Sequence, residues 1–163
     1  MPQRHRDIKV QKLFFSVSLC LCGIWFFACT TMREEPQSRL PTIPVTLPDG
    51  QVIRAELATD PADQQRGLMF RTALAPDGGM LFVFPQPGNH PFWMYQTLIP
   101  LDIIWIDAGR RIVFISAKTP PCPPEKGQKC PNYGGEQAAQ FVLEMAAGSG
   151  VAHGLKTGDQ LQF

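Results

Sequence analysis

The sequence predicts a mainly β, β-rich α+β domain, folded as a compact small barrel or rolled sheet of about eight strands with one or two short helices. The runs Met80 to Phe84 and Leu101 to Ile106 are almost entirely apolar. Such runs are typical of strands that are covered on both faces or cross the centre of a small barrel. Elsewhere, short apolar runs alternate with Pro- and Gly-containing turns, and one segment alone has clear signals for the start and end of a helix.

The first two strands are expected to form a hairpin. Val45 to Leu47 and Gln51 to Ala58 flank the sequence Pro48-Asp49-Gly50, and an Asp-Gly pair between apolar runs is a strong hairpin signal. Every second residue of the second run is apolar, so one face should be buried and the other mostly in contact with water.

A short helix of about two turns should follow this hairpin. Asp60 can cap the free amides, Pro61 fits the first helical turn and Asp63 lies at the positive end of the dipole. Arg66 lies in the last turn, where a cation is favoured, and Gly67 can end the helix.

The remaining elements alternate short strands with turns. Further strands are expected at Phe92 to Tyr95, Ile112 to Ala117, Gln140 to Met145 and Gln160 to Phe163, with a loop or single helical turn at Gly148 to Gly154.

The first 28 residues have the layout of a secretory signal peptide. A basic head precedes an apolar run from Leu13 to Ala28, which is 16 residues long and so shorter than the roughly 20 that span a bilayer. The sequence from Trp25 to Cys29 resembles a bacterial lipobox, although Phe26 stands where lipoboxes usually have Leu. Cleavage there would leave Cys29 at the N-terminus, ready to carry lipid.

The expected organisation is a signal peptide (1–28), a lipidated Cys29 with a flexible tether (29–42) and one β-rich domain (43–163). The predicted location is the bacterial cell envelope, with the protein facing the periplasm. Since Thr30 rather than Asp follows Cys29, the resemblance to lipoproteins implies the outer membrane where one exists. An uncleaved signal anchor and ordinary cleavage to a soluble protein are the alternatives.

The cysteine count agrees with export. Of five cysteines, two lie in the leader and Cys29 is the lipid site, which leaves Cys122 and Cys130 in a proline-rich loop. In an oxidising compartment this pair is expected to form a disulfide. Zinc is the competing interpretation, but two cysteines in a loop without histidine supply only half of a tetrahedral set.

The charge of the chain argues against nucleic acid as a partner. After the leader is subtracted, 11 basic residues (15 − 4) face 13 acidic ones (14 − 1), a net charge of −2. There is no basic patch or stripe of the kind that binds nucleic acid. The expected partners are the membrane, through the N-terminal lipid, and an unknown small ligand or envelope protein.

Several sequence blocks together resemble domain-of-unknown-function family 192, over roughly Ile43 to Phe163. The blocks are Arg66-Gly67-Leu68-Met69-Phe70-Arg71, Gly79-Met80-Leu81-Phe82, Phe92-Trp93-Met94, Thr97-Leu98-Ile99-Pro100-Leu101-Asp102 and Gly158-Asp159. The resemblance implies a small β-rich fold that is often exported. It implies no catalytic residue, cofactor or substrate.

Asp102 is the most suggestive polar residue, because it interrupts an apolar strand where a carboxylate must find compensating donors. Arg66 and His90 are the candidate partners. The alternative is that Asp102 accepts main-chain amides around Thr97 to Leu101 and merely shapes that turn.

A cleft lined by Arg66, His90, Trp93, Met94, Thr97 and Asp102 is the predicted binding site. In the run from Phe92 to Tyr95, alternation places Trp93 and Tyr95 on one face, where they could stack on a sugar or aromatic ring. The alternative is that Trp93 or Met94 fills the core. A binding module is therefore the first interpretation of function.

An envelope enzyme is the second interpretation, with Asp102 and His90 acting as an acid–base pair on a small or saccharide-like substrate. No nucleophile motif such as Gly-x-Ser-x-Gly is present. Cu(I) binding by methionine sulfur is a further alternative, although Met69, Met80, Met94 and Met145 have no recognisable ligand spacing. No cofactor and no metal site are predicted.

Overall fold

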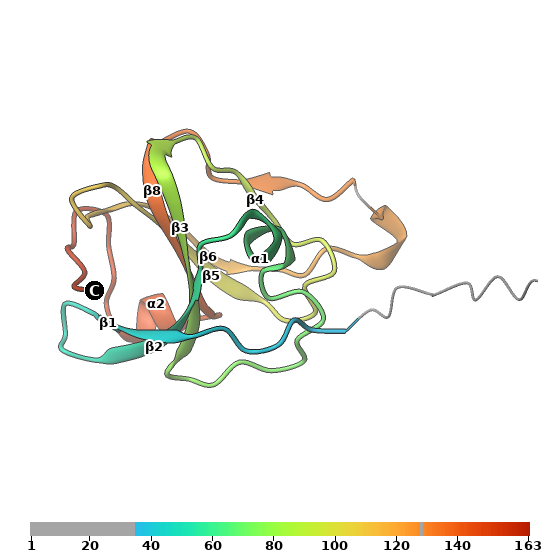
Figure 1. The fold of residues 1–163 in the computed structure, drawn as a ribbon, viewed down its shortest axis with the longest axis horizontal. Helices are drawn as coiled ribbons and strands as arrows, with labels where there is room; N and C mark the ends of the chain where they lie inside the picture. Colours follow the sequence, from blue (N-terminus) through green and yellow to red (C-terminus); the bar gives the residue numbers. More distant parts are fainter. Residues whose placement is uncertain (1–34, 128) are drawn as a thin grey trace, which may run out of the picture. The chain divides into compact units, whose positions relative to one another are not determined.

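The computed structural model describes residues 35–127 and 129–163 (Figure 1). The predicted signal peptide, Cys29 and the first part of the tether lie outside the described residues. In the part that is described, no helix is both long enough and apolar enough to cross a membrane.

The domain is built from eight strands and three short helical segments within the described residues. In chain order these are β1 (Thr42–Thr46), β2 (Val52–Ala58), α1 (Pro61–Arg66), β3 (Gly78–Gly88), β4 (Phe92–Trp93), β5 (Leu101–Ile106), β6 (Ile112–Thr119), the 3-10 helix η1 (Pro124–Lys126), β7 (Asn132–Tyr133), β8 (Ala139–Ala146) and α2 (Ser149–Ala152).

Six strands form one sheet in the order β1-β2-β3-β8-β5-β6, and β4 pairs with β7 separately. Strands β3 and β8 lie side by side at the centre (Figure 1). All neighbours are antiparallel except β2 and β3, which α1 connects. The predicted β-rich fold is confirmed, but the sheet stays open instead of closing into a barrel.

The two faces of the sheet carry separate cores. On the first face, residues of the central strands pack with both chain ends of the domain; its members include Val45, Ile53, Leu81, Ile104, Leu143 and Leu161. On the second face, the central strands are covered by the chain after α1 and by the segment around β4; its members include Leu68, Met80, Phe82, Met94, Ile103, Trp105 and Val142. The candidate site lies at the edge of this second core.

Three local predictions need correction. The strand expected at Phe92 to Tyr95 stops at Trp93, because the Met94 carbonyl accepts the Thr97 N–H (3.2 Å) and turns the chain. The last strand is reduced to isolated bridges, since Gln162 pairs with Thr46 and Gln160 with Arg111. The Asp60 side chain makes no cap hydrogen bond, although its carbonyl accepts the Gln64 N–H at 2.9 Å.

Part of the predicted tether contacts the domain. The Gln37 amide donates to the Gly67 carbonyl (2.8 Å), and the Leu40 N–H donates to a Glu56 carboxylate oxygen (3.0 Å). The Pro41 carbonyl accepts the Leu57 N–H at 2.8 Å. Ordered contacts therefore begin several residues before the expected domain start at residue 43.

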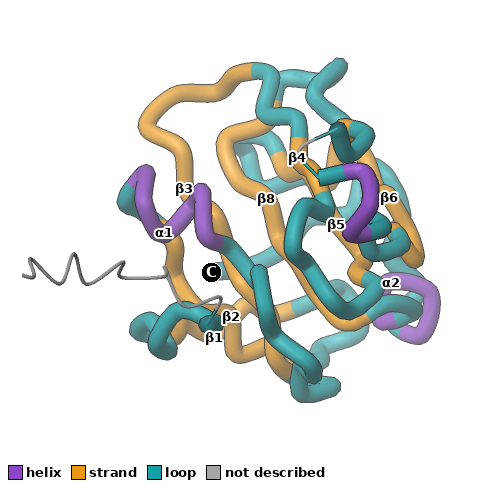
Figure 2. The backbone as a smooth tube through the Cα atoms, turned by 90° about the vertical axis from the view of Figure 1, so that its right-hand side faces the viewer, coloured by secondary structure: helices purple, strands orange, loops and turns teal. Residues whose placement is uncertain are grey.

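The second short helix fastens the β5 side of the sheet. Figure 2 shows α2 beside β5 and β6, and the Gly150 N–H of α2 donates to Asp102 of β5 at 2.7 Å. The expected single helical turn at Gly148 to Gly154 is thus present and anchored to the core.

Candidate ligand-binding site

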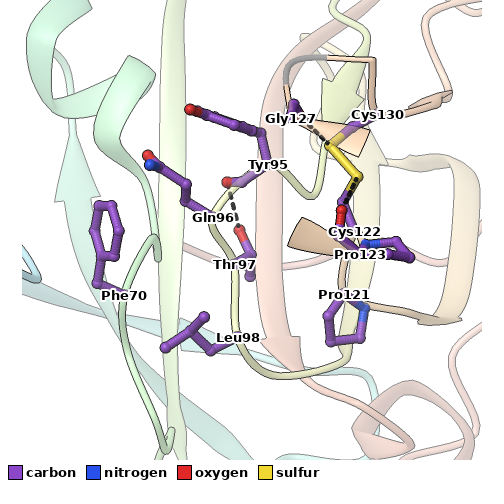
Figure 3. A pocket seen from close by; sticks show the side chains of 10 residues that line it. All are labelled: Phe70, Tyr95, Gln96, Thr97, Leu98, Pro121, Cys122, Pro123, Gly127 and Cys130. Carbon is purple, nitrogen blue, oxygen red and sulfur yellow. Dashed lines mark hydrogen bonds between the residues drawn. A yellow bond between two sulfur atoms is a disulfide. The ribbon is translucent and has the colours of Figure 1, made fainter. Parts of the chain in front are cut away.

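A pocket of about 620 Å³ lies between the segment after β4 and the disulfide loop (Figure 3). Residues of these two segments face each other across it, with Phe70 on one flank. The lining residues are Phe70, Tyr95, Gln96, Thr97, Leu98, Pro121, Cys122, Pro123, Gly127 and Cys130. This volume falls within the range of roughly 300 to 1,000 Å³ that is usual for small-molecule sites.

The disulfide loop forms one wall of this pocket. Cys122 and Cys130 are bonded, with 5.7 Å between their Cα atoms, which confirms the expected pairing. The Cys122 N–H also donates to the Met94 carbonyl (3.3 Å), so the wall is attached to the opposite side at its base. Prolines fix the backbone on both sides of Cys122. The disulfide, this hydrogen bond and the prolines therefore hold the wall in shape, and its one regular element among the described residues is the short helix η1.

A second pocket of about 340 Å³ adjoins the first, because Tyr95 and Gln96 line both. Its other lining residues are Ala62, Gln65, Arg66, Met69 and Trp93. The Trp93 and Tyr95 rings lie 5.1 Å apart between centroids, tilted by 37°, and both are half-buried. We call the two pockets together the aromatic groove.

The predicted alternation around β4 is confirmed. Met94 is fully buried, and Phe92 packs edge-on against Phe82 with ring centroids 4.8 Å apart. Trp93 and Tyr95 instead line the groove. Met94, expected to line the cleft, thus belongs to the core, which was the alternative interpretation for that residue.

Two residues of the groove have unusual backbone conformations. Phe70 and Gln96 both have positive φ angles, 62° and 54°, which are uncommon for residues other than glycine. The Phe70 N–H donates to the Gln96 carbonyl at 2.8 Å, so the two segments hold each other. The Arg66 guanidinium lies 4.8 Å above the Phe70 ring, a cation–π contact. Strained residues of this kind cluster at binding sites.

Asp102 does not line the groove. It is completely buried, and its two carboxylate oxygens accept the main-chain N–H groups of Lys118 and Gly150, each at 2.7 Å. The expected partnership with Arg66 or His90 is not formed. The alternative, that main-chain amides donate to the Asp102 carboxylate, is confirmed for the type of donor. The donors, however, come from β6 and α2 rather than from residues 97 to 101.

His90 and Thr97 line different pockets, and Thr97 is itself largely buried. The His90 ring stacks on Phe84 at 3.6 Å between centroids and lines a separate pocket of about 290 Å³, of which Trp93 is also a part. The Thr97 hydroxyl lies 3.4 Å from the Tyr95 carbonyl and faces the larger pocket. The structure therefore brings Arg66, Trp93 and Thr97 to the aromatic groove, with His90 next to it.

Glu144 is a candidate that the sequence reasoning missed. It lies in β8, is only 5% exposed, and its Oε2 atom has no hydrogen-bond partner. Burial raises the pKa of this carboxyl to about 8, against a smaller opposing effect of Arg71. Because a single acid in an apolar strand was the signal that selected Asp102, the same signal could have selected Glu144.

The potential metal ligands do not come together in the described part of the chain. No group of three or more His, Cys, Asp or Glu side chains there could hold a metal ion. Met80, Met94 and Met145 are fully buried, and Met69 nearly so. These methionines fill the core next to apolar and aromatic side chains, as expected for flexible thioethers.

The open six-stranded sheet with its aromatic groove defines the described part of the chain as a small β-rich domain that carries a surface groove. The chain belongs to the DUF192 family, described as "Uncharacterized ACR", which matches residues 45–163. The family resemblance seen in the sequence is thereby confirmed. No match was found among curated proteins.

Two solved structures are similar to this chain. A protein of unknown function from Novosphingobium aromaticivorans DSM 12444 is 36% identical, with a TM-score of 0.71 over 79% of this chain and 90% of that chain. A protein from Sinorhizobium meliloti 1021, described as a "putative transcription regulator", is 30% identical, with a TM-score of 0.69 over 77% of this chain and 96% of that chain.

Proposed function

We propose that this domain is a binding module whose ligand places a ring with an apolar face, such as a sugar or aromatic ring, in the aromatic groove. The observation that carries the proposal is the half-buried Trp93–Tyr95 pair, 5.1 Å between centroids, at the junction of two adjoining pockets. Such side chains offer a wide apolar surface together with a polar tip.

The rest of the groove suits recognition of a ring with polar edges. The Gln96 amide and the Thr97 hydroxyl border the larger pocket, and Leu98 and Phe70 add apolar surface. A mainly apolar lining with a few fixed polar groups is the usual composition of small-ligand sites. The disulfide wall and the Phe70–Gln96 hydrogen bond hold these groups in place before the ligand arrives, which lowers the entropic cost of binding.

The contacts of Asp102 and His90 argue against the acid–base pair considered for an enzyme. The acid–base pair considered for an enzyme requires Asp102 next to His90, but both oxygens of Asp102 are bound by main-chain amides and the His90 ring stacks on Phe84. Glu56, another buried acid, is paired with Arg71. We therefore do not propose Asp102 and His90 as a catalytic pair.

We further propose that the protein is exported and anchored in the cell envelope by lipid on Cys29. Two features support this: the leader with its lipobox-like end, and a disulfide, which persists in oxidising compartments. Mass spectrometry of the mature N-terminus tests the proposal. A diacylated Cys29 is expected, and an intact leader would favour a signal anchor instead.

Nucleic acid is not proposed as the ligand, although one similar protein is described as a "putative transcription regulator". Beyond the leader the chain has a net charge of −2, from 11 basic and 13 acidic residues. Binding to phosphate backbones depends on clustered Lys and Arg. A fluorescence-anisotropy titration with duplex DNA at low salt should give no saturable binding.

The ring proposal is tested with two neutral probes, methyl β-D-glucopyranoside and benzyl alcohol. Nitrogen-15 NMR should show saturable shifts of the Gln96 and Thr97 amides on addition of at least one probe. Trp93→Ala should weaken binding at least tenfold while the domain stays folded, because it removes half of the ring pair.

Phe114→Ala is the matched control, since Phe114 is a surface aromatic on β6, away from the groove lining. It should leave probe binding unchanged. If Trp93→Ala instead unfolds the domain as a core deletion would, or if neither probe shifts the groove amides, the proposed function is wrong.

A further inference from the structure

Glu144 lies in the middle of the sheet on the face that the aromatic groove covers. Within the ladder it pairs with Met80 of β3 on one side and with Ile103 of β5 on the other. Both neighbours belong to the second core, together with Leu68 and Met94, which come from the segments next to the groove. A carboxyl group thus stands among apolar side chains directly beneath the groove segments.

The carboxyl of Glu144 differs from the other buried acids in having an unused atom. Both carboxylate oxygens of Asp102 accept hydrogen bonds from main-chain amides, and both of Glu56 accept hydrogen bonds from the Arg71 guanidinium. The Oε2 atom of Glu144 is inaccessible to bulk solvent and has no partner. An unsatisfied buried polar group costs about 1 to 3 kcal/mol, so an apolar residue would serve the core better.

A small chamber of about 30 Å³ has Glu144 among its lining residues. This is enough for one or two water-sized groups, since a single one needs roughly 10 to 15 Å³ on this measure. The chamber shares Gln65, Arg66, Met69 and Trp93 with the smaller pocket of the aromatic groove. It therefore lies next to the position where a ring on Trp93 would carry its substituents.

We propose that Glu144 and this chamber form a polar subsite of the aromatic groove, in which the carboxylic acid donates a hydrogen bond to an uncharged oxygen of the ligand, a hydroxyl or carbonyl. The subsite rests on the proposed ring-binding function and narrows it to rings that bear such an oxygen at the edge next to Trp93. Carboxylic acids kept neutral by burial can donate hydrogen bonds in this way.

The electrostatic surroundings agree with a neutral donor. Burial holds the pKa of Glu144 at about 8, so the group carries its proton at neutral pH. Two cations bear on this position: Arg66 lines the chamber, and Arg71, which lowers the pKa of Glu144, is itself paired with Glu56. From the β4 segment, Tyr95 and His90 are the titratable groups, and both lie in neighbouring pockets.

The test measures probe affinity at pH 6 and pH 9 with methyl β-D-glucopyranoside and benzyl alcohol, both of which carry a hydroxyl and no charge. If only the protonated carboxyl is competent, the wild-type dissociation constant should rise about tenfold by pH 9, because the competent fraction falls by that factor. Glu144→Gln keeps an uncharged donor and should bind the probes equally at both pH values. Because Tyr95 and His90 are still present in this variant, equal binding would show that neither of them causes the pH dependence. Glu144→Leu should bind weakly at both.

The outcomes separate the two proposals. Wild-type binding that is independent of pH, or normal binding by Glu144→Leu, would overturn the subsite while ring binding stands, and would make Glu144 a buried acid whose chamber holds water alone. No binding of either probe at any pH, or full binding by Trp93→Ala, would overturn the groove itself. Circular dichroism spectra recorded at pH 6 and pH 9 establish that each variant is folded.

Discussion

Substitution of Asp102 by Asn tests whether this acid supports the fold rather than the ligand site. In the structure Oδ1 accepts the Lys118 N–H and Oδ2 accepts the Gly150 N–H, both at 2.7 Å, in a site with no solvent exposure. Asparagine can accept one of these bonds, but its NH₂ group then faces the other N–H. One buried donor is left unpaired, which costs about 1 to 3 kcal/mol.

The assay is urea unfolding followed by circular dichroism. Asp102→Asn should lower the unfolding midpoint without changing the slope, since the same surface is exposed. Asp60→Asn is the control, because Asp60 is exposed and makes no side-chain cap bond; its effect should stay within about 0.5 kcal/mol. A loss below about 0.5 kcal/mol for Asp102→Asn, or weaker probe binding by the folded variant, would refute the structural role.

Three further predictions concern stability. Removing the Cys122–Cys130 bond by double substitution with serine should cost about 2 to 3 kcal/mol by the loop-entropy estimate, and a thiol count on the unreduced protein should find neither cysteine free. Gly134→Ala should lower the melting temperature, because its Cβ would lie 2.4 Å from the Trp105 ring at a φ of +62°; an unchanged melting temperature would contradict the packing there. The pKa of Glu144 is about 8 in the folded protein against an ordinary 4.5. The free energy of unfolding should therefore be highest below about pH 4.5 and should fall as the pH rises to 8, by on the order of 4 kcal/mol relative to Glu144→Gln. Parallel pH profiles of the two proteins would refute this.

The sheet could be predicted because its signals are local. The apolar runs of β3 and β5 and the Asp49-Gly50 turn identify strands and a hairpin from neighbouring residues alone. The strand order could not be predicted in the same way, because β8 lies between β3 and β5 through contacts between residues that are distant in sequence. No periodicity reports which strand lies next to which, so a closed barrel and an open sheet could not be distinguished.

The site was predicted in part for the same reason. Alternation from Phe92 to Tyr95 is local, and it placed Trp93 and Tyr95 together correctly, although β4 itself ends at Trp93. The partners of Asp102 could not be read from the sequence, because its donors lie 16 and 48 residues away. The Cys122–Cys130 disulfide was predicted, but the composition of its loop does not indicate that the loop would face Tyr95 across a pocket.

The central proposal for this protein is that its aromatic groove holds a ring. A crystal structure of the protein grown with saturating methyl β-D-glucopyranoside at pH 6 tests this directly. Density for the sugar is expected against the Trp93 and Tyr95 rings, with one hydroxyl within hydrogen-bonding distance of the Glu144 carboxyl. A groove that stays filled with water alone, or a sugar bound on another face, would contradict it.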